Sequence, residues 1–260
     1  MVTLHEALAF LRGLAPEESA LDNDPVGLLI TSPDAQDVAR IGVCLDLTPA
    51  AARRAAEARV DLVIAHHPLL YHPLKRIDPG ADPISAAAVT LVKHNIALYA
   101  MHTNWDRAAD GINDTLAHAL ELRNIMPLGH DGAKSLPRLG DLPSPMDLDA
   151  FFAWVAARLD GAGTNALRIN RPDGAAKVAR VAVCGGAGAF LTSDVLAAGA
   201  DAYVTSDVRH HEFLDAAARG LALLDAGHDG TETPGMRRMA EILTKQFPNV
   251  ETIWLGNPKN

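Results

Sequence analysis

Three short stretches of this chain place imidazole and carboxylate side chains directly after apolar runs. Imidazole nitrogen and carboxylate oxygen are ligands that proteins offer to Zn, Fe, Mn, Co and Ni. Two such ions a few ångströms apart supply a hydroxide nucleophile at neutral pH. The pattern therefore indicates a metal centre, and the side chains concerned are His66, His67, His102, Asp106, His228 and Glu232.

The apolar runs are typical of strands that are buried on both faces, and alanine-rich helical stretches separate them. This alternation predicts an α/β fold with largely parallel sheets. Binding sites in open α/β sheets collect at the carboxyl ends of the strands, so ligands that follow three strands are expected to converge. The predicted strands are 39–47, 60–65, 95–100, 178–184, 201–206 and 221–226, and the predicted helices are 49–59, 83–94, 111–122, 190–200 and 211–220.

His66 and His67 are adjacent, so a regular strand would point them to opposite faces. Pro68 keeps His67 extended, and at the strand end the two imidazoles can turn toward two ions. His228 and Glu232 are four residues apart, a spacing that would place them on the same face of a helix. Nearby glycines and a proline favour a tight loop instead. Each stretch alone is also compatible with a simple polar turn, and no H-E-x-x-H motif is present.

Two other stretches follow strands and offer different chemistry. Glycine amides in the Gly185-Gly186-Ala187-Gly188 turn could bind a phosphate. Neither a dinucleotide fingerprint nor a P-loop is present, so we favour a tight strand-to-helix turn. In residues 205–213, the side chains of Asp207, His210, His211 and Glu212 could support the metal ligands or contact substrate. We favour Asp207 as a helix cap, with both histidines on the first helical turn.

Composition limits the classes of function. The 260 residues are 48% hydrophobic, enough for one large or two small domains, and the net charge of −9 gives no general basic footprint for nucleic acid. Cys44 and Cys184 lie in apolar strand-like runs and are not expected to form a disulfide. Thr3 and Glu6 have the spacing of a capping box, so the N-terminus predicts a helix rather than a signal peptide. No run could span a bilayer, and a cytoplasmic protein is expected.

The middle of the chain differs from its flanks. Residues 126–146 are rich in proline, glycine and charge, and we interpret them as a connection between lobes. Residues 170–177 predict a loop within the second lobe. The C-terminal segment "FPNVETIWLGNP" offers one further short strand that could return to the first lobe.

Five blocks of the sequence together resemble the NIF-three-like family, the GTP cyclohydrolase I type 2 homologues. In chain order they are "DLVIAHHPLL", "LYAMHTNWDRAADGINDTLA", "VAVCGGAG", "AYVTSDVRHHEFLDA" and "DAGHDGTETPGM". The resemblance implies two interlinked α/β lobes with mostly parallel sheets, and a metal site at strand C-terminal ends between them. It implies a first lobe of 1–126 with 227–260, carrying most ligands, and a second lobe of 127–226. It also implies a toroidal homohexamer.

The resemblance assigns five metal ligands to positions already selected by the strand ends. His66 and His67 would serve different ions of a dinuclear centre. Asp106 and Glu232 would bridge the two ions, and His228 would complete the ligand set of one of them. The two divalent transition metal ions are not distinguished by these ligand types.

The chain departs from the family pattern in two places. Many relatives carry a Trp-Asp-Asn-x-Gly-Leu block, but this chain has "LDNDPVGLL", with Leu21 in place of the aromatic residue and Asp24 altering the spacing. A substrate contact in that loop is therefore not assigned. The long middle domain of some relatives is absent, so the chain resembles the short bacterial form.

The resemblance implies a metal-dependent hydrolase that opens the guanine ring of GTP with loss of formate. His102 and His211 are candidates for proton transfer in that reaction. The alternative is a toroidal metal-binding protein with a regulatory or scaffold role and little turnover. A ring that threads nucleic acid is a third hypothesis, which the acidic net charge opposes.

Overall fold

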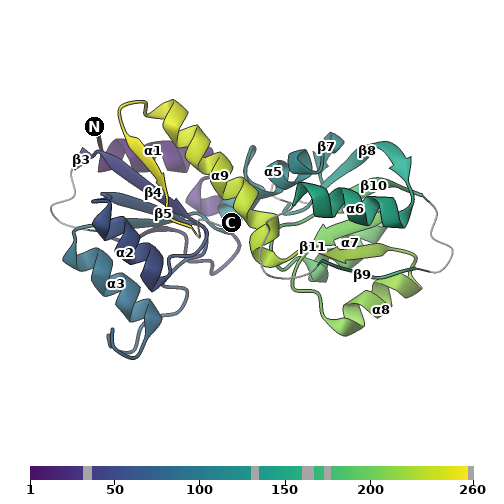
Figure 1. Ribbon diagram of the computed structural model, residues 1–260, viewed down its shortest axis with the longest axis horizontal. Helices are drawn as coiled ribbons and strands as arrows, with labels where there is room; N and C mark the ends of the chain where they lie inside the picture. The colour runs from purple at the N-terminus through teal and green to yellow at the C-terminus, as the bar shows by residue number, and fades with distance from the viewer. Residues whose placement is uncertain (32–36, 130–134, 160–166, 173–176, 257–260) are drawn as a thin grey trace. The chain divides into compact units, whose positions relative to one another are not determined.

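The computed structural model divides the chain into two compact units (Figure 1). The first unit comprises residues 1–105 and 236–259, and the second comprises residues 106–235. The predicted domain boundaries lie elsewhere, after residues 126 and 226. The described residues are 1–31, 37–129, 135–159, 167–172 and 177–256.

The first unit contains a five-stranded sheet of order β13-β4-β5-β6-β2, parallel except for the edge strand β2. The predicted return of the C-terminal segment is confirmed, because β13 pairs with β4. A small antiparallel sheet joins β1 and β3. The strands are β1 (Val2–Thr3), β2 (Gly27–Ile30), β3 (Asp37–Val38), β4 (Arg40–Cys44), β5 (Leu62–Ala65), β6 (Ala97–Ala100) and β13 (Glu251–Trp254).

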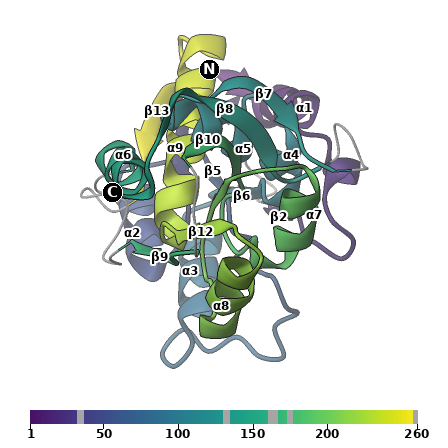
Figure 2. The same cartoon turned by 90° about the vertical axis from the view of Figure 1, so that its right-hand side faces the viewer.

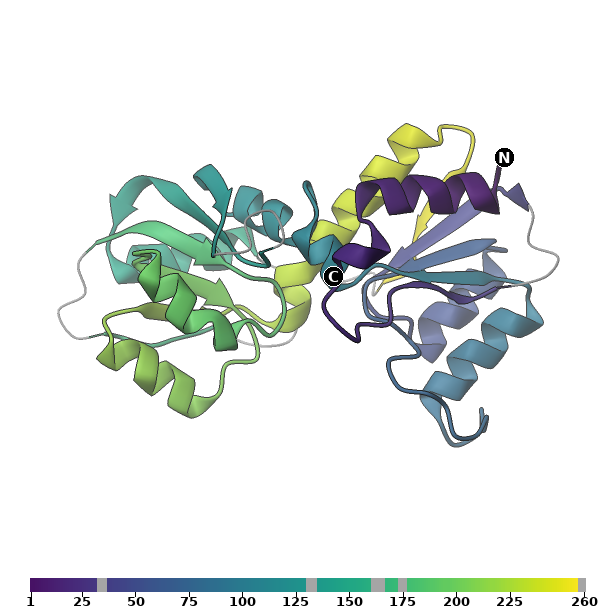
Figure 3. The same cartoon turned by 180° about the vertical axis from the view of Figure 1, so that it is seen from behind.

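Helices α2 and α3 pack on one face of this sheet through small side chains such as Ala52, Ala55 and Ala87. Helix α1 lies along the opposite face (Figure 3), and the predicted Thr3–Glu6 capping box at its start is confirmed. The helices are α1 (Leu4–Leu14), η1 (Glu17–Ser19), α2 (Pro49–Glu57), α3 (Pro83–Lys93), α4 (Thr103–Arg107) and α9 (His228–Gln246). Helices α4 and α9 each contain one of the two divisions between the units.

The second unit contains a six-stranded sheet of order β7-β8-β10-β11-β12-β9 (Figure 2). Its central strands β10, β11 and β12 are parallel, and antiparallel strands flank them on both sides. The α/β class is confirmed in both units. The strands are β7 (Arg123–Pro127), β8 (Arg138–Met146), β9 (Arg168–Ile169), β10 (Val178–Val183), β11 (Ala202–Thr205) and β12 (Ala222–Asp225).

Each face of this second sheet is covered by helices. Phe151 and Val155 of α6, with Leu116 of α5, pack in one core cluster, whereas α7 and α8 contribute Val195 and Ala216 to the other. Because α5 packs on this sheet, residues 106–126 belong to the second unit. The helices are α5 (Ile112–Ala119), α6 (Leu148–Arg158), η3 (Ala189–Leu191), α7 (Thr192–Ala197) and α8 (His210–Ala218).

The interpretation of residues 126–146 as a connection is wrong for its described parts. Strand β8 occupies 138–146 and pairs with both β7 and β10, so the segment is part of the sheet. Its leucines at 139 and 142 are buried, and buried Arg138 is compensated by an ion pair with Asp114. Residues 130–134 lie outside the described part, as do residues 173–176 of the loop predicted at 170–177.

Cys44 and Cys184 are both buried and free, as predicted. Burial raises the pKa of the Cys184 thiol to about 12, so it remains protonated at neutral pH. Within the described residues, none of the helices has the length and apolar character needed to cross a membrane.

Candidate metal centre

His66 and His67 extend strand β5 beyond its last regular residue. Their backbone N–H groups donate to the carbonyls of Cys44 and Leu45, each at 3.1 Å, so the segment remains extended alongside β4. The two imidazole rings nevertheless lie next to each other, with their centroids 5.0 Å apart and an angle of 50° between their planes. The turn into Pro68 thus brings together two side chains that a regular strand would separate.

His102 follows the neighbouring parallel strand β6 and joins this pair. Its ring centroid lies 5.2 Å from that of His66 and 5.6 Å from that of His67. One nitrogen from each of the three rings can be chosen so that all three lie within 4.8 Å of one another. The expectation that strand ends converge therefore holds within the first unit.

The Nδ1 atom of His66 is hydrogen-bonded to a backbone carbonyl oxygen. Its Nδ1 lies 2.7 Å from the carbonyl oxygen of Met101. A carbonyl oxygen only accepts hydrogen bonds, so Nδ1 carries the proton and the lone pair lies on Nε2. This is how metal-binding histidines are commonly oriented, because the remote hydrogen bond fixes the tautomer and the direction of the ring.

Carboxylates hold the other two rings of the first unit in the same way. The Nδ1 of His67 lies 2.8 Å from Oδ1 of Asp46, and the Nδ1 of His102 lies 2.8 Å from Oδ1 of Asp24. Each imidazole therefore keeps Nε2 for another partner. A carboxylate behind an imidazole also makes that imidazole a stronger ligand.

Asp24 is itself fixed by further donors. Its Oδ2 accepts hydrogen bonds from the backbone N–H of Thr103 at 3.1 Å and from the Thr103 hydroxyl at 2.5 Å. Burial alone raises the pKa of Asp24, but the hydrogen bonds from His102 and Thr103 outweigh it and hold that pKa below its usual range. Asp24 is thus an anionic support for the His102 ring.

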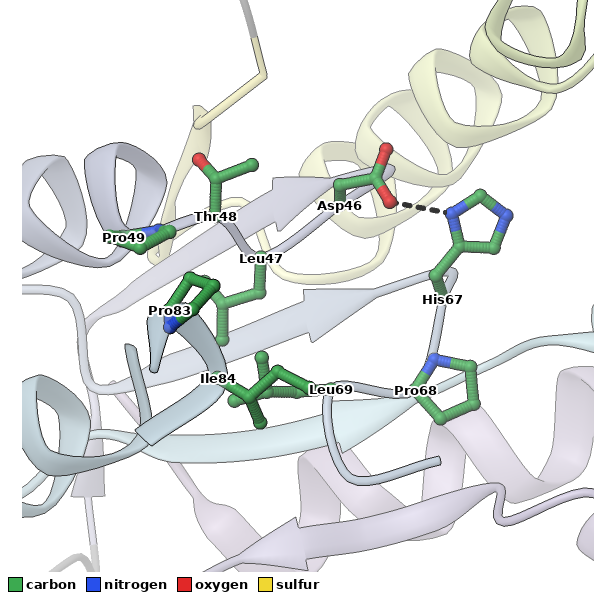
Figure 4. A pocket seen from close by; sticks show the side chains of 9 residues that line it. All are labelled: Asp46, Leu47, Thr48, Pro49, His67, Pro68, Leu69, Pro83 and Ile84. Atoms are coloured by element: carbon green, nitrogen blue, oxygen red, sulfur yellow. Dashed lines mark hydrogen bonds and ion pairs between the residues drawn. The ribbon is translucent and has the colours of Figure 1, made fainter. Parts of the chain in front are cut away.

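A pocket of about 230 Å³ lies beside His67 (Figure 4). Asp46 and His67 stand at one end of it, and the other walls are mainly apolar, with Leu47, Leu69 and Ile84 among them. Its described lining residues include no lysine or arginine. Drug-sized ligands occupy roughly 300–1,000 Å³, so the pocket suits an uncharged part of a substrate rather than a whole nucleotide.

His228 and Glu232 lie in the first turns of helix α9, so the predicted loop is wrong here. The Nε2 of His228 lies 3.2 Å from Oε2 of Glu232. Two donors bound to one ion lie about 3.0–3.4 Å apart when each is about 2.1 Å from it. Glycine at 235 serves close packing instead of a loop, because a Cβ there would come within 2.7 Å of the Ile112 Cα.

Asp207 orients His228 and does not cap helix α8. The Nδ1 of His228 lies 2.5 Å from Oδ2 of Asp207, and the residue at the cap position of α8 is Arg209. Asp207 has a φ of +54°, a left-handed conformation that aspartate tolerates better than most residues. The prediction of Asp207 as a cap is wrong because the chain first turns the carboxylate back toward His228.

Asp106 is 7% exposed and lies in helix α4. Its backbone carbonyl accepts a hydrogen bond from Nδ2 of Asn113 at 3.1 Å. The next carbonyl, that of Arg107, accepts one from the buried guanidinium of Arg138 at 2.8 Å. These donors fix the backbone that presents the Asp106 carboxylate.

The glycine turn after β10 contacts the segments that carry these candidate ligands. The amide of Gly185 donates to Oδ1 of Asn113 at 2.7 Å, and the amide of Gly186 donates to Oγ1 of Thr231 at 3.0 Å. Gly188 donates to Thr205 at 2.9 Å. These amides are engaged by side chains, so the prediction of a tight turn is confirmed over that of a phosphate cradle.

The sequence predictions missed Asp24 and Asp46 as supports of the histidines, whereas Asp207 was considered for such a contact but a helix cap was favoured. Asp46 and Asp207 also follow strands, β4 and β11, so strand ends were an available signal for both. Asp24 carried no such signal. His210 and His211 lie on the first turn of α8 as predicted, and His211 is exposed. Among the described residues, those in groups that could hold a metal ion are His66, His67, His102, Asp106, His228 and Glu232.

These features define an α/β protein of two units whose strand ends and adjoining helices carry histidines and carboxylates suited to metal binding. The chain belongs to the Duf34/NIF3 (NGG1p interacting factor 3) family, whose model matches residues 2–260. The predicted family resemblance is thereby confirmed.

Relatives are found in many bacteria and beyond. A GTP cyclohydrolase 1 type 2 homolog of Streptomyces coelicolor is 38% identical over 241 residues, covering 90% of this chain and 83% of the relative. A hypothetical protein of Staphylococcus aureus has a similar fold, with a TM-score of 0.88 at 24% identity over 97% of this chain and 96% of that one. Reduced HcgD from Methanocaldococcus jannaschii gives a TM-score of 0.82 at 27% identity, covering 98% of each chain.

Proposed function

We propose that this protein is a metal-dependent hydrolase with two divalent ions bound by His66, His67, Asp106, His228 and Glu232. The observation that carries the proposal is a hydrogen-bonding arrangement that its histidines share. In each of the three histidines of this set, Nδ1 is engaged by a carbonyl or carboxylate oxygen, which directs Nε2 outward as a ligand. The mixed nitrogen and oxygen donor set fits Zn, Fe, Mn, Co or Ni.

The protein residues would hold the ions and orient the substrate, and the ions would supply the reactive chemistry. Bound ions of this kind polarise a substrate and lower the pKa of a bound water, so that hydrolysis proceeds at neutral pH. Asp46 and Asp207 keep their histidines in one tautomer and one direction. The pocket beside His67 would receive an uncharged part of the substrate and exclude water from it.

The name of the curated relatives suggests the substrate class. They are called GTP cyclohydrolase 1 type 2 homologs, so we propose hydrolytic opening of the guanine ring of GTP with release of formate. The mainly apolar pocket suits a purine ring better than a triphosphate, since its described lining residues include the carboxylate of Asp46 and no lysine or arginine. We also propose that the protein assembles as a homohexamer, as the family resemblance implies.

The experiment compares metal content and turnover in the same samples. The full chain is supplied with Mn²⁺, Fe²⁺ or Zn²⁺, freed of unbound ions and measured by elemental analysis, then incubated with GTP while formate is assayed. His66→Ala and Asp106→Asn should lose metal and turnover. His118→Ala, which changes an exposed histidine on α5, should match the wild type. Light scattering during gel filtration gives the mass of the assembly.

Each result decides one part of the proposal. Wild-type protein that retains no ion overturns the metal centre. Protein that retains ions but releases no formate from GTP overturns the hydrolase and supports the alternative, a metal-binding scaffold with little turnover. Loss of ions in the two site variants, together with loss of formate, supports the full proposal.

A further inference from the structure

His102 is held as firmly as the histidines of the proposed ligand set, although it was not among them. Its Nδ1 lies 2.8 Å from Asp24, and the Asp24 side chain is only 4% exposed. Thr103 donates two further hydrogen bonds to the same carboxylate. Three hydrogen bonds on a nearly buried carboxylate fix its position, and the position of the carboxylate fixes the direction of the His102 ring.

The ring so fixed faces the other two imidazoles of the first unit. Its centroid is 5.2 Å from that of His66 and 5.6 Å from that of His67, nearly perpendicular to both at 69° and 76°. One nitrogen from each of the three rings lies within 4.8 Å of the other two, and the Nδ1 atom of each ring has an oxygen partner. Three imidazoles whose ligand atoms lie this close together can share one cation.

A role in proton transfer alone explains this arrangement less well. A proton-transfer group needs access to substrate, whereas His102 is packed edge to face against two other imidazoles and its side chain is only 21% exposed. The geometry suits an imidazole that contributes a ligand atom beside His66 and His67.

We propose that His102 is a metal ligand in its own right and that Asp24 is its positioning residue. The first unit then contributes three imidazoles to the centre instead of two. This inference rests on the proposed function, because it concerns the same ions. It also gives the altered "LDNDPVGLL" loop a role in holding a ligand.

The test distinguishes metal binding by Nε2 of His102 from a purely structural role of the His102 side chain. In His102→Asn, the side-chain amide can still donate to Asp24, but the group corresponding to Nε2 is gone. Asp24→Asn keeps the shape of the support and removes its charge. His72→Ala changes an exposed histidine of the same unit and serves as the control. Each protein is titrated with Co²⁺ while binding is measured by calorimetry and by the visible absorption of the bound ion.

The expected result is a loss of affinity for one of the two ions, with a changed cobalt spectrum. Asp24→Asn should weaken the binding of that ion about 10-fold, within the range seen when supports of metal-binding histidines are removed. His102→Asn should weaken its binding by a larger factor, because the ligand atom itself is lost. Circular dichroism should show all variants folded. An unchanged affinity and spectrum in folded His102→Asn would overturn the inference while leaving the metal centre intact. Failure of wild type to bind Co²⁺ would instead remove the proposed function itself.

Discussion

A methyl group on Gly186 would overlap with the Oε1 atom of Glu232 and would lie 3.3 Å from Nε2 of His228. The missing side chain at Gly186 therefore makes room for two proposed ligands at once. Gly186 also has a φ of +64°, which glycine adopts at little cost. The glycine turn therefore leaves space for the side chains of the proposed metal centre.

Gly186→Ala is expected to weaken metal binding at least about 10-fold, because Glu232 must move. Left-handed backbone costs an alanine roughly 1–2 kcal/mol in addition. Gly199→Ala is the matched control, since Gly199 has a φ of +73° with no atom within 4 Å of an added Cβ. Both variants should lose stability in urea, and only Gly186→Ala should lose metal affinity by calorimetry. Equal metal affinity in the two variants contradicts this role of Gly186.

Asp207→Asn should weaken metal binding about 10-fold without unfolding the protein. Asparagine tolerates the left-handed conformation of Asp207, so the backbone is not strained by the change. The loss of charge makes His228 a poorer ligand. Asp215→Asn, an exposed change on α8, provides the control. Competition with a colorimetric chelator measures the affinity, and identical values for the two variants would exclude the orienting role.

Ile84→Trp should fill the pocket beside His67 and impair substrate binding while the metal content stays the same. The larger side chain displaces whatever enters between Leu47 and Leu69. KM for GTP should rise about 10-fold, which is about 1.4 kcal/mol of lost binding. Val92→Trp lies on the same helix, 61% exposed, and should leave KM unchanged. An unchanged KM in Ile84→Trp argues that substrate binds elsewhere.

The two thiols should be unreactive in the folded protein. Burial raises the pKa of Cys184 to about 12 and raises that of Cys44 still further, so little thiolate exists below pH 9. A chromogenic disulfide reagent at pH 8 should label neither thiol in native protein and both in urea. Rapid labelling of the native protein would show that one strand end opens.

Acid should weaken the N-terminal helix through Glu6. The backbone N–H and hydroxyl of Thr3 donate to its carboxylate and hold the pKa of Glu6 below its ordinary value of 4.5. A lowered folded-state pKa contributes stability above the unfolded value, and this contribution disappears as pH falls through the folded value. Glu6→Gln should lower Tm at pH 7 and much less at pH 3, unlike Glu18→Gln. A constant difference at both pH values rules out this linkage.

Much of the site was predictable from local sequence. The strands that end at His66, at His102 and before His228 are continuous apolar runs. The first two are neighbours in one parallel sheet, so their ends lie at one edge of it, whereas the third belongs to the sheet of the second unit. The strands predicted at 60–65, 95–100 and 221–226 correspond to β5, β6 and β12. Continuous apolar runs are reliable predictors of such strands, because burial of their side chains stabilises the strand in either sheet.

The errors arose where composition was outweighed by packing. Glycine and proline near His228 suggested a loop, but α9 begins at His228, and Gly235 lies within that helix where it packs closely against Ile112. The proline-rich segment before Met146 suggested a linker, yet β8 completes a sheet between β7 and β10. Local propensity is a weak prior when a segment can bury apolar surface against a neighbour.

The sequence by itself determined the α/β class, the strands and most of the side chains that can bind a metal, since each depends on neighbours along the chain. Only the tertiary structure decided which carboxylate holds which imidazole. Asp24 and His102 are 78 residues apart, and Asp207 and His228 are 21 apart, so no local pattern records either pair. A hydrogen bond needs two atoms within about 3 Å, and distance in space is set by the fold as a whole.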